Sequence, residues 1–172
     1  YKNTLSHNTV VVDGQNQEPV TGELVEFKES SVKAKVSGAY TGVEMERNIT
    51  FGSDTFTDIF TATGQESHTF DYVLLPVDRP AYAYAAVDSD LGYAGPYSYI
   101  SKVKKLEYEA GMILSVGDYT VSFTVENGSV DGVYVGEAPG YPYQDAPTAS
   151  CWPIVVRIKG NQMKVKSVWN LD

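Results

Sequence analysis

Apolar and polar residues alternate with a period of two along much of the chain. The clearest example is VSFTVE at positions 121–126, and TFTDIFTA at 55–62 has the Thr, Phe and Ile composition of a pleated strand surface. No segment sustains the period of 3.6 residues that an amphipathic helix requires. The pattern therefore predicts a chain made almost entirely of β-strands.

Short turn signals divide this pattern. Gly52-Ser53 fits a two-residue hairpin loop with glycine first, and Asn127-Gly128 and Gly160-Asn161 are expected to close two further hairpins. The predicted strands, about a dozen, cover roughly residues 8–12, 22–28, 31–37, 43–51, 55–63, 68–76, 81–87, 101–110, 112–116, 119–126, 130–137, 154–159 and 163–169. Many short strands joined by hairpins predict an all-β fold, a large antiparallel β-sandwich of the supersandwich kind.

The strand pattern runs from one end of the chain to the other, so we expect a single β-sandwich domain over residues 1–172. The first residues already carry the pattern, and VKSVWNLD at 165–172 still resembles a strand. We therefore expect the chain to be a piece of a longer protein. Two segments rich in Gly, Pro and Tyr, 88–100 and 138–152, are expected to be loops, and loops of this length are often functional.

The charge and cysteine content exclude several classes of function. The formal net charge is −9 and no basic run is present, so neither nucleic-acid binding nor binding to an anionic membrane surface is expected. No apolar run approaches the ~20 residues of a membrane-spanning helix. Cys151 is the only cysteine, which excludes an internal disulfide, and it is expected to be a small apolar residue near Trp152.

The first predicted hairpin places two opposite charges together. If Gly52-Ser53 is the loop, the numbers of cross-strand partners sum to 105, and Arg47 faces Asp58. Their neighbours are largely apolar, and a buried carboxylate needs a partner. We predict a structural ion pair, either buried or exposed on the surface, where it would contribute less than ~1 kcal/mol.

His7 is one of only two histidines and stands at the start of a predicted strand. A histidine in this position can be a hydrogen-bonded structural residue or a metal ligand. Asp13 lies at the far end of the same strand, about 20 Å away at ~3.3 Å per residue, which is too far to share an ion. If His7 binds a metal, the other ligands must come from elsewhere, and no spacing argument brings His68 close.

Three segments carry a resemblance to a known family. TLSHNTVVVDGQNQ at 4–17 resembles the His-Asn-Thr signature of the heparinase II/III-like polysaccharide lyases, which include oligo-alginate lyases. Arg47 followed by FTDIFTATGQESHTFDYVLLPVD at 56–78 is similar to a later segment of that family, and PIVVRIKGNQMKVKSVW at 153–169 is similar to its closing strands. The resemblance covers most of the chain, and the first segment is the most specific.

The resemblance implies an N-terminal α/α toroid followed by a β-sandwich, and cleavage of polysaccharides that contain uronic acid by β-elimination. The catalytic base and acid would lie upstream of Tyr1, so the chain alone is expected to be inactive. His7 matches a zinc ligand that joins a histidine and an aspartate from an upstream segment, and Asn8 would orient the strand by hydrogen bonds. His68, Asp71 and Tyr72 match positions that we interpret as structural.

The same resemblance implies an acidic polysaccharide or oligosaccharide as substrate of the full-length enzyme and the toroid of the same protein as a partner. It also implies export to the periplasm or secretion. Zinc is expected to be held weakly or not at all by this chain alone, because one ligand is too few.

Two further hypotheses remain open. In the first, the chain is a non-catalytic carbohydrate-binding module whose tyrosines stack on sugar rings, with Asn8, Tyr97 and Tyr141 as candidate carbohydrate contacts and Tyr93, Tyr99 and Tyr143 nearby in the same loops. In the second, it is a structural or partner-binding sandwich without a role in sugar chemistry.

Overall fold

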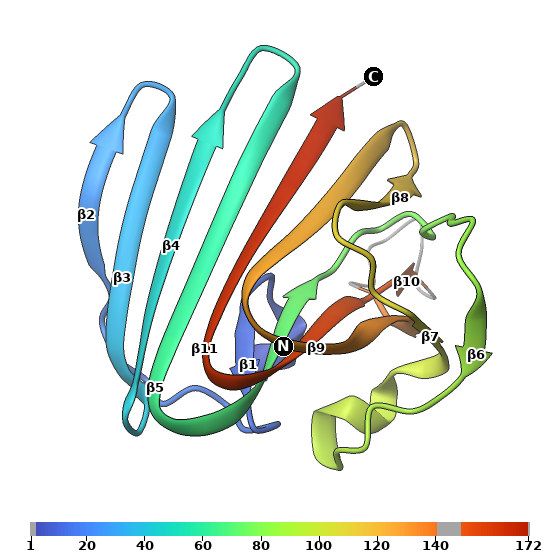
Figure 1. Cartoon of the computed structure of the whole chain (residues 1–172), viewed down its shortest axis with the longest axis horizontal. Coiled ribbons are helices and arrows are strands. Elements are labelled where there is room, and N and C mark those ends of the chain that lie inside the picture. Colours follow the sequence, from blue (N-terminus) through green and yellow to red (C-terminus); the bar gives the residue numbers. More distant parts are fainter. Residues whose placement is uncertain (1–2, 141–148, 172) are drawn as a thin grey trace.

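The computed structural model describes residues 3–140 and 149–171 (Figure 1). The strands are β1 (Val10–Val12), β2 (Glu23–Lys28), β3 (Ser31–Tyr40), β4 (Val43–Phe51), β5 (Thr55–Leu74), β6 (Ala86–Asp88), β7 (Ser101–Leu106), β8 (Met112–Val116), β9 (Tyr119–Pro139), β10 (Ser150–Cys151) and β11 (Ile154–Leu171). Two short 3-10 helices, η1 (Thr4–Ser6) and η2 (Gly95–Tyr99), complete the described elements. The predicted all-β antiparallel sandwich is confirmed.

The strands pair in the order β2-β3-β4-β5-β11-β9-β7-β6, with β1 attached to β5 and both β8 and β10 attached to β9. Consecutive hairpins build the run from β2 to β5, at the left of Figure 1, and β11 then lies between β5 and β9. All pairings are antiparallel. The last strand of the chain is thus the central strand of the sheet.

Two of the three predicted hairpins are wrong. Asn127-Gly128 lies inside β9 and Gly160-Asn161 lies inside β11, so each pair of predicted short strands is one long strand. β11 pairs with β5 on both sides of Gly160, and β5 itself joins the two strands predicted at 55–63 and 68–76. The register of β11 shifts between Gly160 and Gln162, which marks a β-bulge instead of a chain reversal.

Glycine at positions 128 and 160 has a different purpose from the predicted one. Gly128 has φ +90° and Gly160 has φ +150°, which L side chains rarely adopt. A Cβ on Gly128 would clash with the Ile158 side chain and lie 2.9 Å from the carbonyl oxygen of Gln162. Glycine there lets two long strands bend together while staying paired.

Other strand boundaries also differ from the expectation. The strand expected at 81–87 reduces to an isolated bridge between Ala81 and Ser115 and to β6 at Ala86–Asp88. The strand expected at 101–110 ends at Leu106, and the loop expected at 88–100 contains η2. Of these segments only 88–100 contains Gly and Pro, so local sequence does not mark the strand limits at 81–87 and 101–110, and tertiary contacts fix them.

The core lies on the two faces of the curved sheet. The main cluster occupies the inner face and includes the fully buried rings of Phe70, Tyr72 and Phe123. A smaller cluster lies on the opposite face of β1, β5 and β11, where Val11 and Val155 pack with side chains of the η2 region. Strands covered on both faces explain the uninterrupted apolar runs at 10–12 and 154–156.

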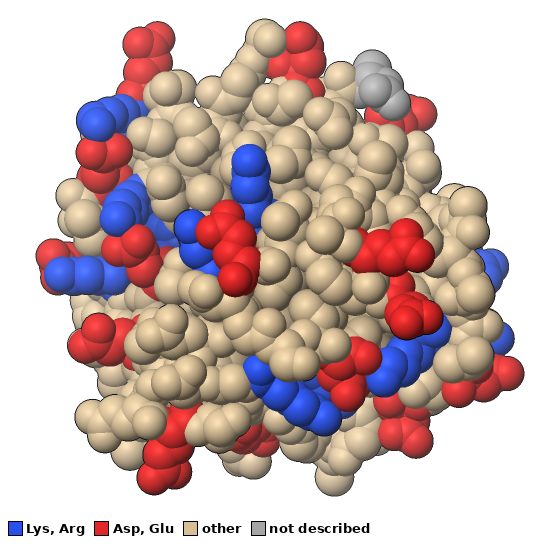
Figure 2. Space-filling view, in the orientation of Figure 1, with Lys and Arg blue, Asp and Glu red and all other residues tan. Residues whose placement is uncertain are grey.

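The surface carries mixed charge. On the face in Figure 2, lysines and arginines lie next to aspartates and glutamates, without an extended basic stretch. Among the described residues, no helix is long and apolar enough to cross a membrane.

Candidate functional site

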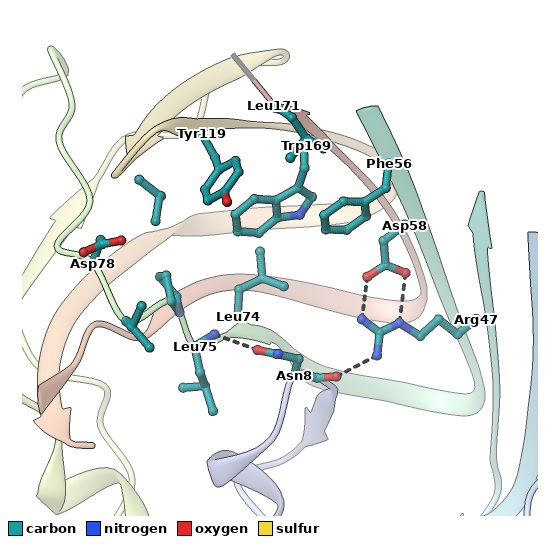
Figure 3. Close-up of a pocket in the computed structure, with 13 residues that line it drawn as sticks. Asn8, Arg47, Phe56, Asp58, Leu74, Leu75, Asp78, Tyr119, Trp169 and Leu171 are labelled. Carbon is teal, nitrogen blue, oxygen red and sulfur yellow. Dashed lines mark hydrogen bonds and ion pairs between the residues drawn. The ribbon is translucent and has the colours of Figure 1, made fainter. Parts of the chain in front are cut away.

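A cleft of about 430 Å³ opens at one end of the inner face, between β5, β9 and β11 (Figure 3). Apolar side chains dominate its wall, and a few polar groups stand at its rim, which is the usual composition of a small-molecule site. Its lining residues are Asn8, Arg47, Phe56, Asp58, Leu74, Leu75, Pro76, Val77, Asp78, Val116, Tyr119, Trp169 and Leu171. We call it the aromatic cleft.

Three rings define the aromatic cleft. Phe56 of β5 and Trp169 of β11 are direct cross-strand partners, with ring centroids 5.5 Å apart and planes inclined by only 8°. Tyr119, at the start of β9, lies on the other side of Trp169, and Leu74 lies below the indole (Figure 3). The rings are fixed because their strands are the long central ones and Trp169 packs against the main core.

An ion pair forms one wall. Arg47 Nε and Nη2 donate to Asp58 Oδ1 and Oδ2 at 2.9 and 2.7 Å, and Asp58 is only 1% exposed. The register is shifted from the expected one, because the loop is longer than two residues: Phe51 pairs with Phe56, so partner numbers sum to 107. Asp58 is therefore opposite Ile49, and Arg47 reaches it diagonally on the same face.

The ion pair continues into a buried network. The Tyr72 hydroxyl donates to Asp58 Oδ2 at 2.8 Å and lies 3.0 Å from Ser167 Oγ. Burial, followed by the nearby Asp58 charge, raises the pKa of Tyr72 well above its usual value. Burial is the largest single influence on Arg47 and lowers its pKa, but the hydrogen bonds with Asp58 and the negative charge of Asp58 together outweigh it, so the pKa of Arg47 is raised. Both oxygens of Asp58 thus accept hydrogen bonds, so the network holds the wall in place and leaves no free base.

Asn8 links this wall to the neighbouring strands. Its Oδ1 accepts a hydrogen bond from the Leu75 N–H at 2.7 Å, and its carbonyl oxygen accepts one from Arg47 Nη1 at 2.7 Å. Asn8 thereby fixes the entry into β1 against the end of β5 and places its amide at the rim of the cleft.

His7 precedes this link and is exposed. Its backbone N–H donates to the carbonyl oxygen of Thr4 at 3.1 Å and closes η1. Over residues 3–140 and 149–171, no group of three or more His, Cys, Asp or Glu is placed to hold a metal ion. The described residues by themselves do not make a zinc site.

A second buried network involves Tyr97, one of the predicted carbohydrate contacts. Its side chain is 3% exposed, and its hydroxyl donates to Asp71 Oδ2 at 2.7 Å. Asp71 also forms a bidentate ion pair with Arg157, whose guanidinium lies over the rings of Tyr93 and Tyr134. Burial raises the pKa of Tyr97. In this arrangement the ring of Tyr97 supports the fold and offers little surface to a sugar, while Tyr141 lies outside the described residues.

His68 makes contacts that are separate from those of His7. Its Nδ1 is 2.7 Å from Asp13 Oδ2, and Asp13 Oδ1 accepts the Thr69 N–H at 2.8 Å. This connection ties the end of β1 to β5 and agrees with a structural role.

A further hollow of about 600 Å³ lies beside η1 and η2, and its wall includes Leu5, Tyr99 and Cys151. No charged side chain is among its described lining residues. Burial raises the pKa of the Cys151 thiol, which keeps it protonated and poorly nucleophilic.

Sequence reasoning missed the aromatic cleft itself. Phe56 and Trp169 are more than 100 positions apart, and Tyr119 and Asp78 come from two further segments. The alternation of Phe56, Asp58 and Phe60 along one strand face was a usable signal. Pairing of β5 with β11 could not be recognised, because residues 154–159 and 163–169 were interpreted as two strands that pair with each other in a hairpin.

Comparison with known proteins gives likeness at the level of the fold. No protein-family model matches the chain, and no curated protein matches it. The solved structure of a heparan sulfate lyase from Pedobacter heparinus is 13% identical with a TM-score of 0.59, and covers 98% of this chain and 24% of that one. A heparinase III structure is 13% identical with a TM-score of 0.57, covering 95% and 23%.

The same fold occurs in another class of protein. A putative aldose 1-epimerase from Escherichia coli is 12% identical with a TM-score of 0.50, and covers all of this chain and 81% of that one. The chain spans about a quarter of the length of the lyase structures. At these identities the comparisons establish a β-sandwich fold similar to one region of heparinase-type lyases.

Proposed function

We propose that this chain is the C-terminal β-sandwich part of a heparinase II/III-like lyase that cleaves a polysaccharide containing uronic acid by β-elimination. The observation that carries the proposal is the fold likeness to such lyases over nearly the whole chain. The His-Asn-Thr sequence at positions 7–9 supports it independently, since it resembles that family's signature. The parent protein would be exported to the periplasm or secreted, and its α/α toroid would be the main partner of this sandwich.

In this proposal the chemistry belongs to residues outside the chain. The titratable groups that line the aromatic cleft are Arg47, Asp58, Asp78 and Tyr119, and Asp58 is occupied by its ion pair. Such a wall can bind a ligand and support the fold, but it does not supply a catalytic base together with a catalytic acid. The catalytic residues would come from the upstream part, and this chain would position them.

His7 is the residue of this chain that would bind zinc in the proposed parent protein. It is exposed at the entry to β1, and in this proposal a histidine and an aspartate from an upstream segment would join it around the ion. The role of the ion would be to fix the edge of the sandwich. Metal analysis of the parent protein tests this apart from activity: about one zinc per chain is expected, and the His7→Ala variant is expected to lose it.

The decisive experiment compares the parent protein with residues 1–172 alone. Each is incubated with heparan sulfate, alginate and an unsulfated glycosaminoglycan, and unsaturated products are followed by ultraviolet absorbance. Elimination by the parent and none by the isolated chain is the expected result. Turnover by residues 1–172 alone would mean that the catalytic base and acid lie within this chain, and would contradict the proposal that they lie upstream of it. A parent that cleaves none of these polymers would favour the non-catalytic module.

A further inference from the structure

We propose that the aromatic cleft is a binding site for an uncharged pyranose ring. This inference concerns recognition of a neutral sugar by residues of this chain, and it does not depend on lyase activity. Three features of the cleft support it, all taken over residues 3–140 and 149–171: aromatic rings in its wall, polar groups at the rim that have no partner, and no uncompensated cation.

The aromatic rings suit the apolar face of a sugar. The C–H groups on one face of a pyranose carry partial positive charge, and the face of an aromatic ring carries partial negative charge. Phe56 and Trp169 stack on each other with planes inclined by 8°, so each ring covers part of one face of the other, and both line the cleft with the ring surface that remains. Leu74 below the indole and Tyr119 beside it complete an apolar surface (Figure 3).

The rim offers hydrogen-bonding groups for hydroxyls. Asn8 uses its Oδ1 on the Leu75 N–H, and within residues 3–140 and 149–171 its Nδ2 has no partner. The same holds in those ranges for the indole N–H of Trp169 and the hydroxyl of Tyr119. A sugar that lies on the rings can therefore meet both donors and acceptors, whereas a purely hydrocarbon ligand would leave them unpaired.

One glycine makes room for the remaining rim carboxylate. Asp78 packs over Gly117, where a Cβ would lie 2.6 Å from its Oδ2, and Gly117 has φ +58° in the turn between β8 and β9. The turn thus brings the carboxylate of Asp78 to the cleft without a side chain in the way. A carboxylate is a strong acceptor for sugar hydroxyls.

The charges select against an acidic sugar. Within the part of the chain that the structure describes, Arg47 is the one cation that lines the cleft, and its charge is balanced by Asp58 at 2.7 Å. Asp78 is then the remaining charge, and it would repel a uronate or a sulfate group. The proposed ligand is therefore a neutral pyranose, such as a glucoside or an N-acetylated amino sugar.

The chain allows a direct optical test, because it contains only two tryptophans. Trp152 lies outside the cleft, under the guanidinium of Arg79. In a Trp152→Phe background, fluorescence reports on Trp169 alone. Titration with methyl β-glucopyranoside and N-acetylglucosamine is expected to give a saturable change, and glucuronic acid is expected to bind at least about fivefold more weakly. The Asp78→Asn variant is expected to reduce that difference.

Matched variants separate the cleft from the rest of the surface. Phe56→Leu and Trp169→Leu keep an apolar strand residue but remove a ring, and saturation-transfer NMR with the same sugars should lose its signal in both. Phe27→Ala removes an exposed ring on β2, 77% exposed, and should leave binding unchanged. Circular dichroism and thermal unfolding verify that each variant is folded.

Several results would overturn the proposal. No saturable change with either neutral sugar would do so, as would equal binding by Trp169→Leu, or equal affinity for glucuronic acid and the neutral glucoside. Light scattering at the same concentrations provides the last check: a dimer that Trp169→Leu abolishes would show that a second copy of the chain covers the cleft. Failure of lyase activity in the parent would leave all these outcomes unaffected.

Discussion

Two carboxylates, Asp58 and Asp71, are each 1% exposed, and each holds an arginine by two hydrogen bonds. They differ in how far the arginine is buried: the Arg47 side chain is 29% exposed and that of Arg157 is 10% exposed. Removing one partner of a buried pair leaves a charge without compensation, which costs far more than the pair contributes. The Asp71 network should therefore be the more sensitive of the two.

Asp71→Asn is expected to lower the free energy of unfolding by ~3–5 kcal/mol, because Arg157 would stay buried without its counter-charge. Urea unfolding followed by circular dichroism measures this. Lys104→Ala is the control, since its partner Asp88 is 91% exposed, and it should cost less than about 1 kcal/mol. Equal losses in the two variants would refute the assignment of Asp71 as a buried structural anion.

Tyr40 gives the fold an alkaline limit. Its hydroxyl donates to the carbonyl oxygens of Val10 and Gln15, and burial raises its pKa from 10.0 to about 12. Between these values the folded chain keeps a proton that the unfolded chain releases, so stability is complete below pH 10 and falls as the pH rises toward 12. The Tyr40→Phe variant lacks this proton.

We expect the loss of unfolding free energy between about pH 9 and about pH 11 to be larger for the native chain than for Tyr40→Phe. Other tyrosines and the lysines titrate in both proteins, so the difference isolates Tyr40. Parallel pH curves would mean that the hydroxyl ionises equally easily in the folded and unfolded states.

Sequence reasoning at this scale reached the right pair for an incomplete reason. Arg47 and Asp58 do form an ion pair, yet as diagonal neighbours, because the loop at 52–54 is longer than the expected two residues. Tyr72 and Ser167, which complete the network, come from distant segments. Local spacing carries no information on such partners.

At the scale of elements, the strands are long and bent where short strands and hairpins were expected. Asn127-Gly128 is a strong hairpin signal in an isolated segment, but here β11 pairs with β9 on both sides of it. Glycine permits a reversal and a bulge equally, because both need unusual backbone angles. A continuous β9 with a bulge is favoured over a hairpin because it gains many cross-strand pairs. No local sequence pattern reveals these pairs.

Gly128→Ala should therefore cost more than an ordinary replacement at positive φ. Gly42 has φ +72° with nothing within 4 Å of a new Cβ, so Gly42→Ala should cost roughly 1–2 kcal/mol from backbone strain alone. At Gly128 the Cβ would also clash with Ile158, which adds about 1–3 kcal/mol. Thermal and urea unfolding of both variants provide the test, and equal costs would argue against a close strand contact at Gly128.

At the scale of the whole molecule, charge limits what the chain can attract. The formal net charge is −9, and ten of the twelve lysines and arginines within residues 3–140 and 149–171 form ion pairs with carboxylates. Acidic and basic side chains lie near one another on the face in Figure 2. A polyanion would thus meet repulsion and few free cations.

The isolated chain is expected to pass through a heparin column without retention even at low salt, because electrostatic retention needs clustered cations. Elution volume measured against a basic marker protein gives the comparison. Retention that weakens with added salt would reveal a cationic surface and contradict this expectation. Overall class and charge were within reach of the sequence, whereas the order of the strands was not, since it depends on pairings across about 100 positions.

The position of β11 in the chain determines when the sheet can be completed during translation. The run β2–β5 and the run β6–β9 make their backbone pairings through β11, so the two halves of the sheet join only after residues 154–171 have left the ribosome. Until then β5 and β9 each present an open edge of about 20 residues, the kind of surface on which nascent chains associate with one another. Pairing between strands so distant in sequence is slow. We therefore expect the nascent chain to depend on chaperones until β11 has been synthesised.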